Sequence, residues 1–188
     1  WYQWLLLPFT LLFFLLSALR RLFFRLGIKK VVTLPVPVIV VGNLSVGGNG
    51  KTPLVVALCE KLQRAGYKVG VVSRGYGAKT TEFPHQVSAN DSAPMVGDEP
   101  LLIARRTGVP VVIDPNRPRA AQQLVEQGCT VIISDDGLQH YALDRDVECV
   151  VADRRLFGNQ QLLPMGPLRE GLWRLNTIDF LILNQAGE

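Results

Sequence analysis

The sequence contains only three cysteines and two histidines among its 188 residues. The cysteines, at positions 59, 129 and 149, stand far apart, and none belongs to a Cys-x-x-Cys pair or a Cys/His spacing typical of a zinc site. This scarcity argues against a disulfide framework and against a structural zinc module. It indicates that the folded part of the chain lies in a reducing compartment, the cytoplasm. Internal repeats are also missing.

Charge is absent from residues 1–19, where Leu and Phe dominate. A helix of that length is about 28 Å long, close to the roughly 30 Å of a bilayer's hydrocarbon core. Five positive charges follow between Arg20 and Lys30, as on the cytoplasmic side of a membrane segment. The pattern predicts that residues 1–30 form a membrane anchor, which either spans the bilayer or lies deep in one leaflet. A buried core helix is the alternative; no small-residue cleavage site supports a signal peptide.

A basic face is missing from the rest of the chain. The formal net charge is +4, and five of the positive charges lie in the flank after the apolar run, so the remainder is nearly neutral. Nucleic-acid binding would need a basic stripe through the folded domain, so no nucleic-acid partner is expected. The basic flank instead suits the anionic headgroups of inner-membrane lipids.

Short apolar runs alternate with helical segments through residues 31–188, which we expect to form one domain. The expected strands are 36–42, 69–73, 109–113, 130–134, 147–151 and 179–183, and the expected helices are 52–65, 100–107 and 117–127. Residues 78–96 are polar without a clear period and predict a long loop or flap. Continuous β-branched strands alternating with helices predict an α/β fold, a mostly parallel sheet with helices on both faces.

A glycine-rich loop separates the first expected strand from the first helix of this domain. It consists of Ser45, Val46, Gly47, Gly48, Asn49, Gly50, Lys51 and Thr52. Strand, glycine-rich loop and helix form the context of a P-loop, whose backbone N–H groups and helix N-terminus bind phosphates. Lys51 can reach the terminal phosphates, and the Thr52 hydroxyl can ligate Mg²⁺. The first position is Ser45 rather than the usual Gly, and a glycine-rich turn without a ligand is the alternative.

Two acidic pairs carry the next candidates. Asp135 and Asp136 follow a buried strand, where a carboxylate can hold magnesium opposite Thr52; the alternative is a turn-capping role. Asp98 and Glu99 precede an expected helix, and from their spacing alone an N-cap and a first-turn acid explain them equally well.

Two single residues are ambiguous from the pattern alone. Arg169 lies in a Pro/Gly-framed loop and is either a neutraliser of phosphate charge or a surface arginine. His140 is either a hydrogen-bonded structural histidine or an active-site group. Asn184, after the last expected strand, carries a weak suggestion of a nucleobase contact.

Five motifs follow the apolar N-terminus in a set order. They are Val-Gly-Asn-Leu-Ser with Val-Gly-Gly-Asn-Gly-Lys-Thr-Pro, Ser-Arg-Gly-Tyr-Gly, Gly-Asp-Glu-Pro, Asp-Asp-Gly-Leu-Gln-His and Gly-Pro-Leu-Arg-Glu. Over its whole length the chain resembles the tetraacyldisaccharide 4'-kinase family, the lipid A 4'-kinases. The resemblance implies transfer of phosphate from ATP, with Mg²⁺, to the 4'-hydroxyl of a tetraacyl glucosamine disaccharide 1-phosphate, giving lipid IVA. It places the reaction at the cytoplasmic face of the inner membrane of Gram-negative bacteria.

The resemblance also implies roles for single residues. Residues 45–52 hold the ATP phosphates, Asp98 is the general base, and Thr52 and Asp135 serve the metal. The remaining expected catalytic residues are Lys51, Glu99, Asp136, His140 and Arg169. Family members carry a second, C-terminal lobe with further active-site residues, which we expect to be absent from this chain.

Two other readings compete with a kinase. A membrane-associated ATPase switch of the partition or cell-division type shares the fold class, but it carries a lysine where this chain has Val46. A nucleotide-binding membrane adaptor without activity would not need carboxylates and Arg169 beside the phosphates. Dependence of ATP turnover on a glycolipid acceptor separates the three.

Overall fold

The structure is a computed structural model, and it describes residues 2–47 and 50–184. The helices are η1 (Tyr2–Leu6), α1 (Leu7–Arg25), α2 (Lys51–Arg64), α3 (Ala93–Val96), α4 (Asp98–Thr107), α5 (Arg117–Glu126) and η2 (Leu172–Asn176), where η marks a 3-10 helix. The strands are β1 (Val38–Gly42), β2 (Val69–Ser73), β3 (His85–Gln86), β4 (Val111–Ile113), β5 (Val131–Asp135), β6 (Val147–Asp153) and β7 (Phe180–Asn184).

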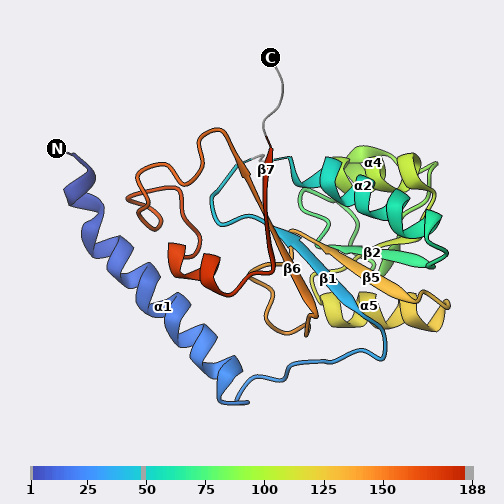
Figure 1. The fold of residues 1–188 in the computed structure, drawn as a ribbon, viewed down its shortest axis with the longest axis horizontal. Coiled ribbons are helices and arrows are strands. Elements are labelled where there is room, and N and C mark those ends of the chain that lie inside the picture. The colour runs from blue at the N-terminus through green and yellow to red at the C-terminus, as the bar shows by residue number, and fades with distance from the viewer. Residues whose placement is uncertain (1, 48–49, 185–188) are drawn as a thin grey trace.

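The strands form one sheet in the order β3-β4-β2-β5-β1-β6-β7. Every neighbouring pair is parallel except β3 with β4, so the predicted mostly parallel sheet is confirmed. The central strand β1 lies between β5 and β6 (Figure 1). The carboxyl ends of parallel strands share one edge of a sheet, so the loops after β1, β5 and β2 meet there.

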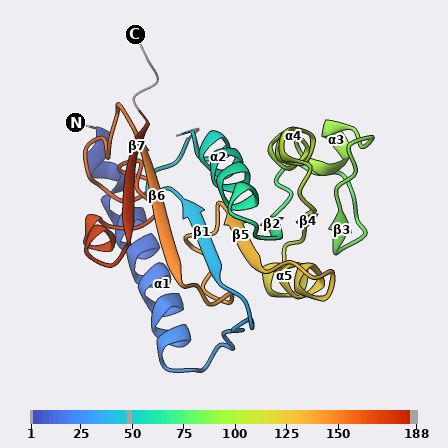
Figure 2. The same ribbon diagram turned by 45° about the vertical axis from the view of Figure 1, so that its right-hand side comes forward.

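Helices cover both faces of the sheet, as predicted. On one face, α2 and α4 contribute Val55, Cys59, Leu101 and Ile103 to a buried cluster with side chains of the strands. On the other face, α5 packs against β2, β4 and β5. The second buried cluster on that face also includes Leu143 before β6 and Leu168 after it, and Leu168 is fully buried. Figure 2 shows α5 on the side of the sheet opposite α2 and α4.

The segment predicted as a long loop contains short regular elements. The strand β3 pairs antiparallel with β4 through His85 and Ile113. The one-turn helix α3 follows, and α4 then begins at Asp98, two residues before its predicted start. A strand of two residues is too short to show an alternating pattern, which explains why the sequence predicted only a loop.

The apolar N-terminal helix lies alongside the domain and not inside it (Figure 1). Near one end of α1, Oγ1 of Thr10 accepts a hydrogen bond from the Met165 N–H at 3.2 Å. Near the other end, the rings of Phe24 and Tyr141 are 5.9 Å apart. In the described part of the chain, residues 4–25 form one helix long and apolar enough to cross a bilayer. Only 6% of its most apolar 18-residue stretch is buried. The alternative of a buried core helix is therefore wrong.

Candidate active site

The loops after β1, β5 and β2 surround a cavity of about 540 Å³. Its lining residues are Gly47, Lys51, Ser73, Arg74, Tyr76, Asp98, Glu99, Pro100, Arg117, Asp136 and Arg169. Six of the predicted site residues therefore line it: Gly47, Lys51, Asp98, Glu99, Asp136 and Arg169. The sheet brings them together from segments more than a hundred residues apart, which is the placement expected at the carboxyl ends of parallel strands.

The P-loop adopts backbone conformations that favour glycine. Gly47 has φ of 115° and Gly50 has φ of 81°, in regions where a Cβ atom is strained. A side chain on Gly50 would also overlap Asn184, so the end of β7 abuts the loop. Lys51 is the first residue of α2, and Thr52 lies in its first turn. Gly48 and Asn49 lie outside the described residues.

The beginning of the P-loop pairs with a distant segment. Ser45 forms an antiparallel bridge with Leu168, and the Val46 N–H donates to the Pro167 carbonyl at 2.8 Å. The Arg169 N–H donates to the Leu44 carbonyl at 2.7 Å. This backbone pairing carries Arg169 to the phosphate-binding loop, and the alternative of a surface arginine away from the site is wrong.

Lys51 and Arg169 converge on one carboxylate. Nζ of Lys51 lies 3.6 Å from Oδ1 of Asp136, and Nη1 of Arg169 donates to Oδ2 at 3.1 Å. Burial on its own would raise the pKa of Asp136, but the charges of Lys51 and Arg169 together lower it, so this carboxylate is ionised. Asp136 also has φ of 48°, in the left-handed region. A carboxylate therefore lies between the two cations that would neutralise a transferred phosphate.

Asp135 is fully buried beside this cluster. Its Oδ2 accepts a hydrogen bond of 3.4 Å from the Ser73 hydroxyl, and its Oδ1 has no partner among the described residues. Burial, together with the negative charge of Glu99, raises the pKa of Asp135 to about 6. A cation would satisfy the unpartnered oxygen, and carboxylate and hydroxyl oxygens are the ligands Mg²⁺ prefers. The unpartnered carboxylate oxygen of Asp135 therefore fits a magnesium ligand, whereas Thr52 does not line the cavity.

Asp98 and Glu99 occupy the first turn of α4. The N-cap position is Gly97, and no side chain caps the helix, so the alternative of Asp98 as an N-cap is wrong. The Asp98 side chain makes no hydrogen bond or ion pair with any described residue, although it lines the same cavity as Lys51. The negative charges of Asp98 and Glu99 are still favourable there, because they lie at the positive N-terminal end of the helix dipole. The Asp98 carboxylate thus lines the cavity without a partner among the described residues, so its oxygens are available to accept a proton.

Two arginines of the cavity had no predicted role. Arg117 is 3% exposed, and its Nη2 donates to the backbone carbonyl of Asp135 at 2.7 Å. Burial lowers the pKa of Arg117 to about 10, which leaves it charged at neutral pH. Arg74 follows β2 and is exposed to the cavity. Both follow strands that end at the same edge of the sheet as β1. Their position after a strand is the feature of the sequence that could have identified them as site residues.

His140 lies beside the site and not in the cavity wall. Its Nε2 is buried without a hydrogen-bond partner among the described residues. Burial, and then the charge of Arg117, lowers the pKa of His140 to about 4. The imidazole is therefore neutral at pH 7, and its backbone carbonyl accepts a hydrogen bond of 2.7 Å from Arg145.

The sheet and the P-loop define this chain as a P-loop NTPase-like protein of the α/β class. A crystal structure of the signal recognition particle 54 kDa protein from Aeropyrum pernix K1 in complex with GDP superposes with a TM-score of 0.51 over 82% of this chain and 36% of that one. At 14% sequence identity this likeness shows the fold alone. The chain belongs to the tetraacyldisaccharide-1-P 4'-kinase (LpxK) family, whose model matches residues 2–188.

Individual relatives agree with this assignment. The chain is 56% identical to the tetraacyldisaccharide 4'-kinases of Shewanella sp. strain MR-4 and Haemophilus influenzae strain 86-028NP, over 98% of its own length in each case. It spans 57% and 58% of those two proteins. A crystal structure of "apo" form LpxK from Aquifex aeolicus in complex with ATP has a TM-score of 0.87 at 36% identity, over 97% of this chain and 59% of that one.

Proposed function

We propose that the protein transfers the γ-phosphate of ATP to the 4'-hydroxyl of a tetraacyl glucosamine disaccharide 1-phosphate, which gives lipid IVA. One observation carries the proposal: Lys51, Asp136 and Arg169 are in contact, and the unpaired Asp98 lines the same cavity. Cations for a phosphate and a free carboxylate for a hydroxyl are the two requirements of phosphoryl transfer to an alcohol. The names of the relatives supply the identity of the acceptor.

ATP is the expected donor, because the related LpxK structure holds ATP and the P-loop is retained here. We assign residues 45–52 to the phosphates, with Lys51 on the terminal ones. Thr52 and Asp135 would hold Mg²⁺, which supplies neutralisation of the phosphate charge. This assignment of Asp135 is supported by its unpartnered Oδ1.

In the proposed reaction Asp98 accepts the proton of the 4'-hydroxyl. The hydroxyl oxygen forms its bond to the γ-phosphorus while the bond from that phosphorus to the bridging oxygen breaks, and ADP leaves with the electron pair. Lys51 and Arg169 neutralise charge on the transferred group, and Asp136 positions both. Glu99 and the neutral His140 complete the proposed set of active-site residues, Glu99 from the cavity wall and His140 from beside it.

The acceptor is a membrane glycolipid, so the site must work at a lipid surface. We assign residues 1–30 as the anchor and residues 31–188 as the kinase domain on the cytoplasmic face of the inner membrane. The contacts of Thr10 and Phe24 with the domain are fourteen residues apart, about 21 Å along the helix. A helix held to the domain over that length favours insertion into one leaflet over a full crossing.

The proposal is tested by transfer of radiolabelled γ-phosphate from ATP to a tetraacyl disaccharide 1-phosphate, using the full-length protein. Labelled lipid IVA is the expected product. ATP hydrolysis at the same rate with and without the acceptor would favour a partition-type ATPase switch and refute the kinase assignment. Absence of any turnover would favour an adaptor.

A further inference from the structure

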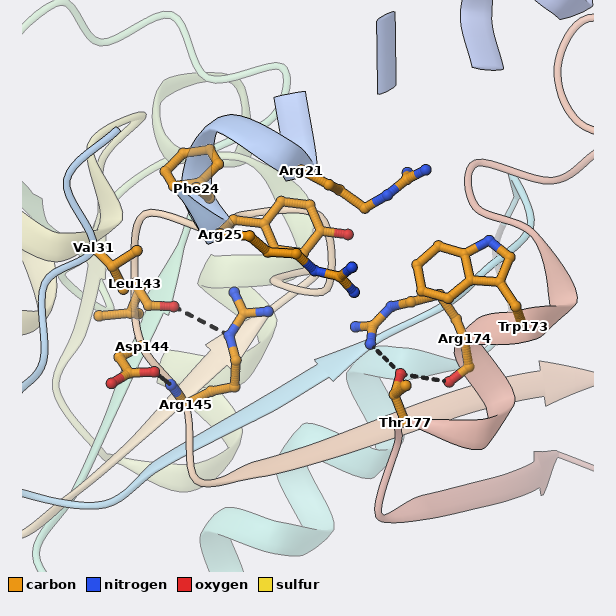
Figure 3. A pocket seen from close by; sticks show the side chains of 11 residues that line it. Arg21, Phe24, Arg25, Val31, Leu143, Asp144, Arg145, Trp173, Arg174 and Thr177 are labelled. Carbon is orange, nitrogen blue, oxygen red and sulfur yellow. Dashed lines mark hydrogen bonds between the residues drawn. The ribbon is translucent and has the colours of Figure 1, made fainter. Parts of the chain in front are cut away.

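A second cavity, of about 270 Å³, lies between the basic end of α1 and the domain (Figure 3). It is separate from the active-site cavity and shares no lining residue with it. Four arginines line it, together with the aromatic rings of Phe24, Tyr141 and Trp173. Since one water occupies about 30 Å³ of liquid, the space exceeds that of a phosphate group.

Two of the four arginines are committed to the fold. Arg174 donates to both carboxylate oxygens of Glu148 at 2.8 Å and to Glu170 at 3.2 Å. Arg145 donates to Glu148 at 2.9 Å and to the His140 carbonyl at 2.7 Å. These two arginines line the cavity and have few donors left for a ligand.

The two arginines of α1 are less committed. Arg21 has one long contact, 3.8 Å to Glu170, and its guanidinium lies 4.9 Å from the Trp173 ring centroid. Arg25, one turn further, is exposed and forms no ion pair with any described residue. Residues four apart lie on the same face of a helix, so both can reach one anion. Asp144 also lines the cavity, but its Oδ2 accepts a hydrogen bond of 2.8 Å from Thr33.

The cavity lies at the C-terminal end of α1, and apolar side chains further along this helix are exposed. Leu12, Leu15 and Leu16 are 54%, 62% and 59% exposed. Trp173, at the cavity rim, is 38% exposed. Trp173 belongs to η2 and lies beside the basic end of α1, and tryptophan with basic residues in such a position is typical of the headgroup level of a membrane. A ligand of this cavity would therefore carry its charge next to a hydrocarbon phase.

We propose that the cavity between α1 and Trp173 binds the phosphate group of an anionic membrane phospholipid, through Arg21 and Arg25. The acyl chains lie along the exposed face of α1, and the rings of Trp173 and Tyr141 contact the glycerol carbons. The site goes beyond the proposed kinase function and does not depend on it, because it is assayed by binding without ATP or the disaccharide acceptor.

A single-charge comparison separates this site from general attraction to a negative surface. Arg25→Gln and Lys30→Gln each remove one positive charge from the same flank, but Lys30 does not line the cavity. General attraction accounts for about fivefold per charge, roughly 1 kcal/mol. Binding of the full-length protein to phosphatidylglycerol vesicles should fall at least about tenfold in Arg25→Gln, and no more than about fivefold in Lys30→Gln. On phosphatidylcholine vesicles the two variants should bind alike. Equal losses on the anionic vesicles would overturn the proposal.

A soluble probe tests the cavity without a membrane. Dihexanoyl phosphatidylglycerol, added below its critical micelle concentration, should change the fluorescence of Trp173 in a saturable way. The contribution of Trp173 is the part of the protein's fluorescence that is lost in Trp173→Phe. The response should fall in Arg21→Gln/Arg25→Gln and be weak with dihexanoyl phosphatidylcholine. Lack of a Trp173 response would overturn the proposal, as would an equal response to the zwitterionic lipid. Inorganic phosphate that binds as tightly as the lipid would also overturn it, because the site would then take a soluble anion.

Discussion

The ammonium of Lys51 lies 3.6 Å from Oδ1 of Asp136, so the P-loop lysine is paired with a carboxylate from the end of the neighbouring strand. The side chains of this pair are 8% and 33% exposed, so the contact is only partly screened by water. The phosphates of a nucleotide would have to compete with Asp136 for the lysine. Arg169, which donates to both oxygens of Asp136 at 3.3 and 3.1 Å, would keep that carboxylate in place when Lys51 turns away.

Loss of Lys51 should therefore abolish most turnover. In Lys51→Ala the charge on the terminal phosphates is missing, and phosphoryl transfer should fall by about 10²–10³. Rates of labelled lipid production measure this effect in the full-length protein. Lys61→Ala, on the exposed side of the same helix α2, is the matched control and should keep its activity. Near-normal turnover in Lys51→Ala would refute the assignment of the P-loop.

Asp98 should act on the acceptor and not on ATP. It lines the cavity, its side chain makes no hydrogen bond or ion pair with the described residues, and no side chain caps α4. Asp98→Asn should lower turnover by about 10²–10⁴ while ATP affinity and melting temperature stay close to wild type. An Asp98 that served the helix alone would change stability and spare the chemistry. A stable variant with weakened ATP binding would instead move Asp98 to the metal site.

Asp135 should make the stability of the protein depend on pH. Its pKa is raised to about 6 in the folded state, so between about pH 4 and 6 the folded protein holds a proton that the unfolded chain has released. This contribution is complete at low pH and is lost as the pH rises through 6. At neutral pH the buried ionised carboxylate is then destabilising.

Asp135→Asn removes that titration. The variant should gain on the order of 1–3 kcal/mol of stability over wild type at pH 7.5, and much less at pH 4.5. Thermal unfolding at both pH values measures the difference. Mg²⁺ with ATP should stabilise wild type and have less effect on the variant. An equal difference at the two pH values would contradict the raised pKa of Asp135.

The local patterns predicted the sheet and the P-loop because these depend on short stretches of sequence. The runs around Val40 and Ile133 are β-branched, and Gly50, Lys51 and Thr52 follow each other directly. The same reasoning placed two sets of site residues at strand ends: Lys51 with Thr52, and Asp135 with Asp136.

The position of Arg169 could not be predicted in this way. It depends on a backbone pairing between Leu44 and a segment more than a hundred residues later, and no periodicity reports such a contact. Arg117 was missed for a related reason, since it begins α5 and its local signal is that of a helix start. The docking of α1 against Met165 is equally non-local. Composition predicted an apolar helix there but not the face it turns to the domain.

The exposed face of α1 should control membrane association. Leu12 and Leu16 are one turn apart and 54% and 59% exposed, whereas Thr10, on the face toward the domain, is 7% exposed. In Leu12→Glu/Leu16→Glu two apolar contacts with lipid are replaced by charges, which disfavours insertion by several kcal/mol. Co-sedimentation of the full-length protein with membranes should fall strongly, while its melting temperature without membranes changes little, because neither side chain packs in the core. Ala18→Glu is not a suitable control, since the Ala18 side chain is partly buried.

Deletion of residues 1–30 should also weaken association, but it exposes the surface around Tyr141 and Glu170 that α1 covers, so it should lower stability as well. Undiminished co-sedimentation of both variants would mean that another surface is the main anchor.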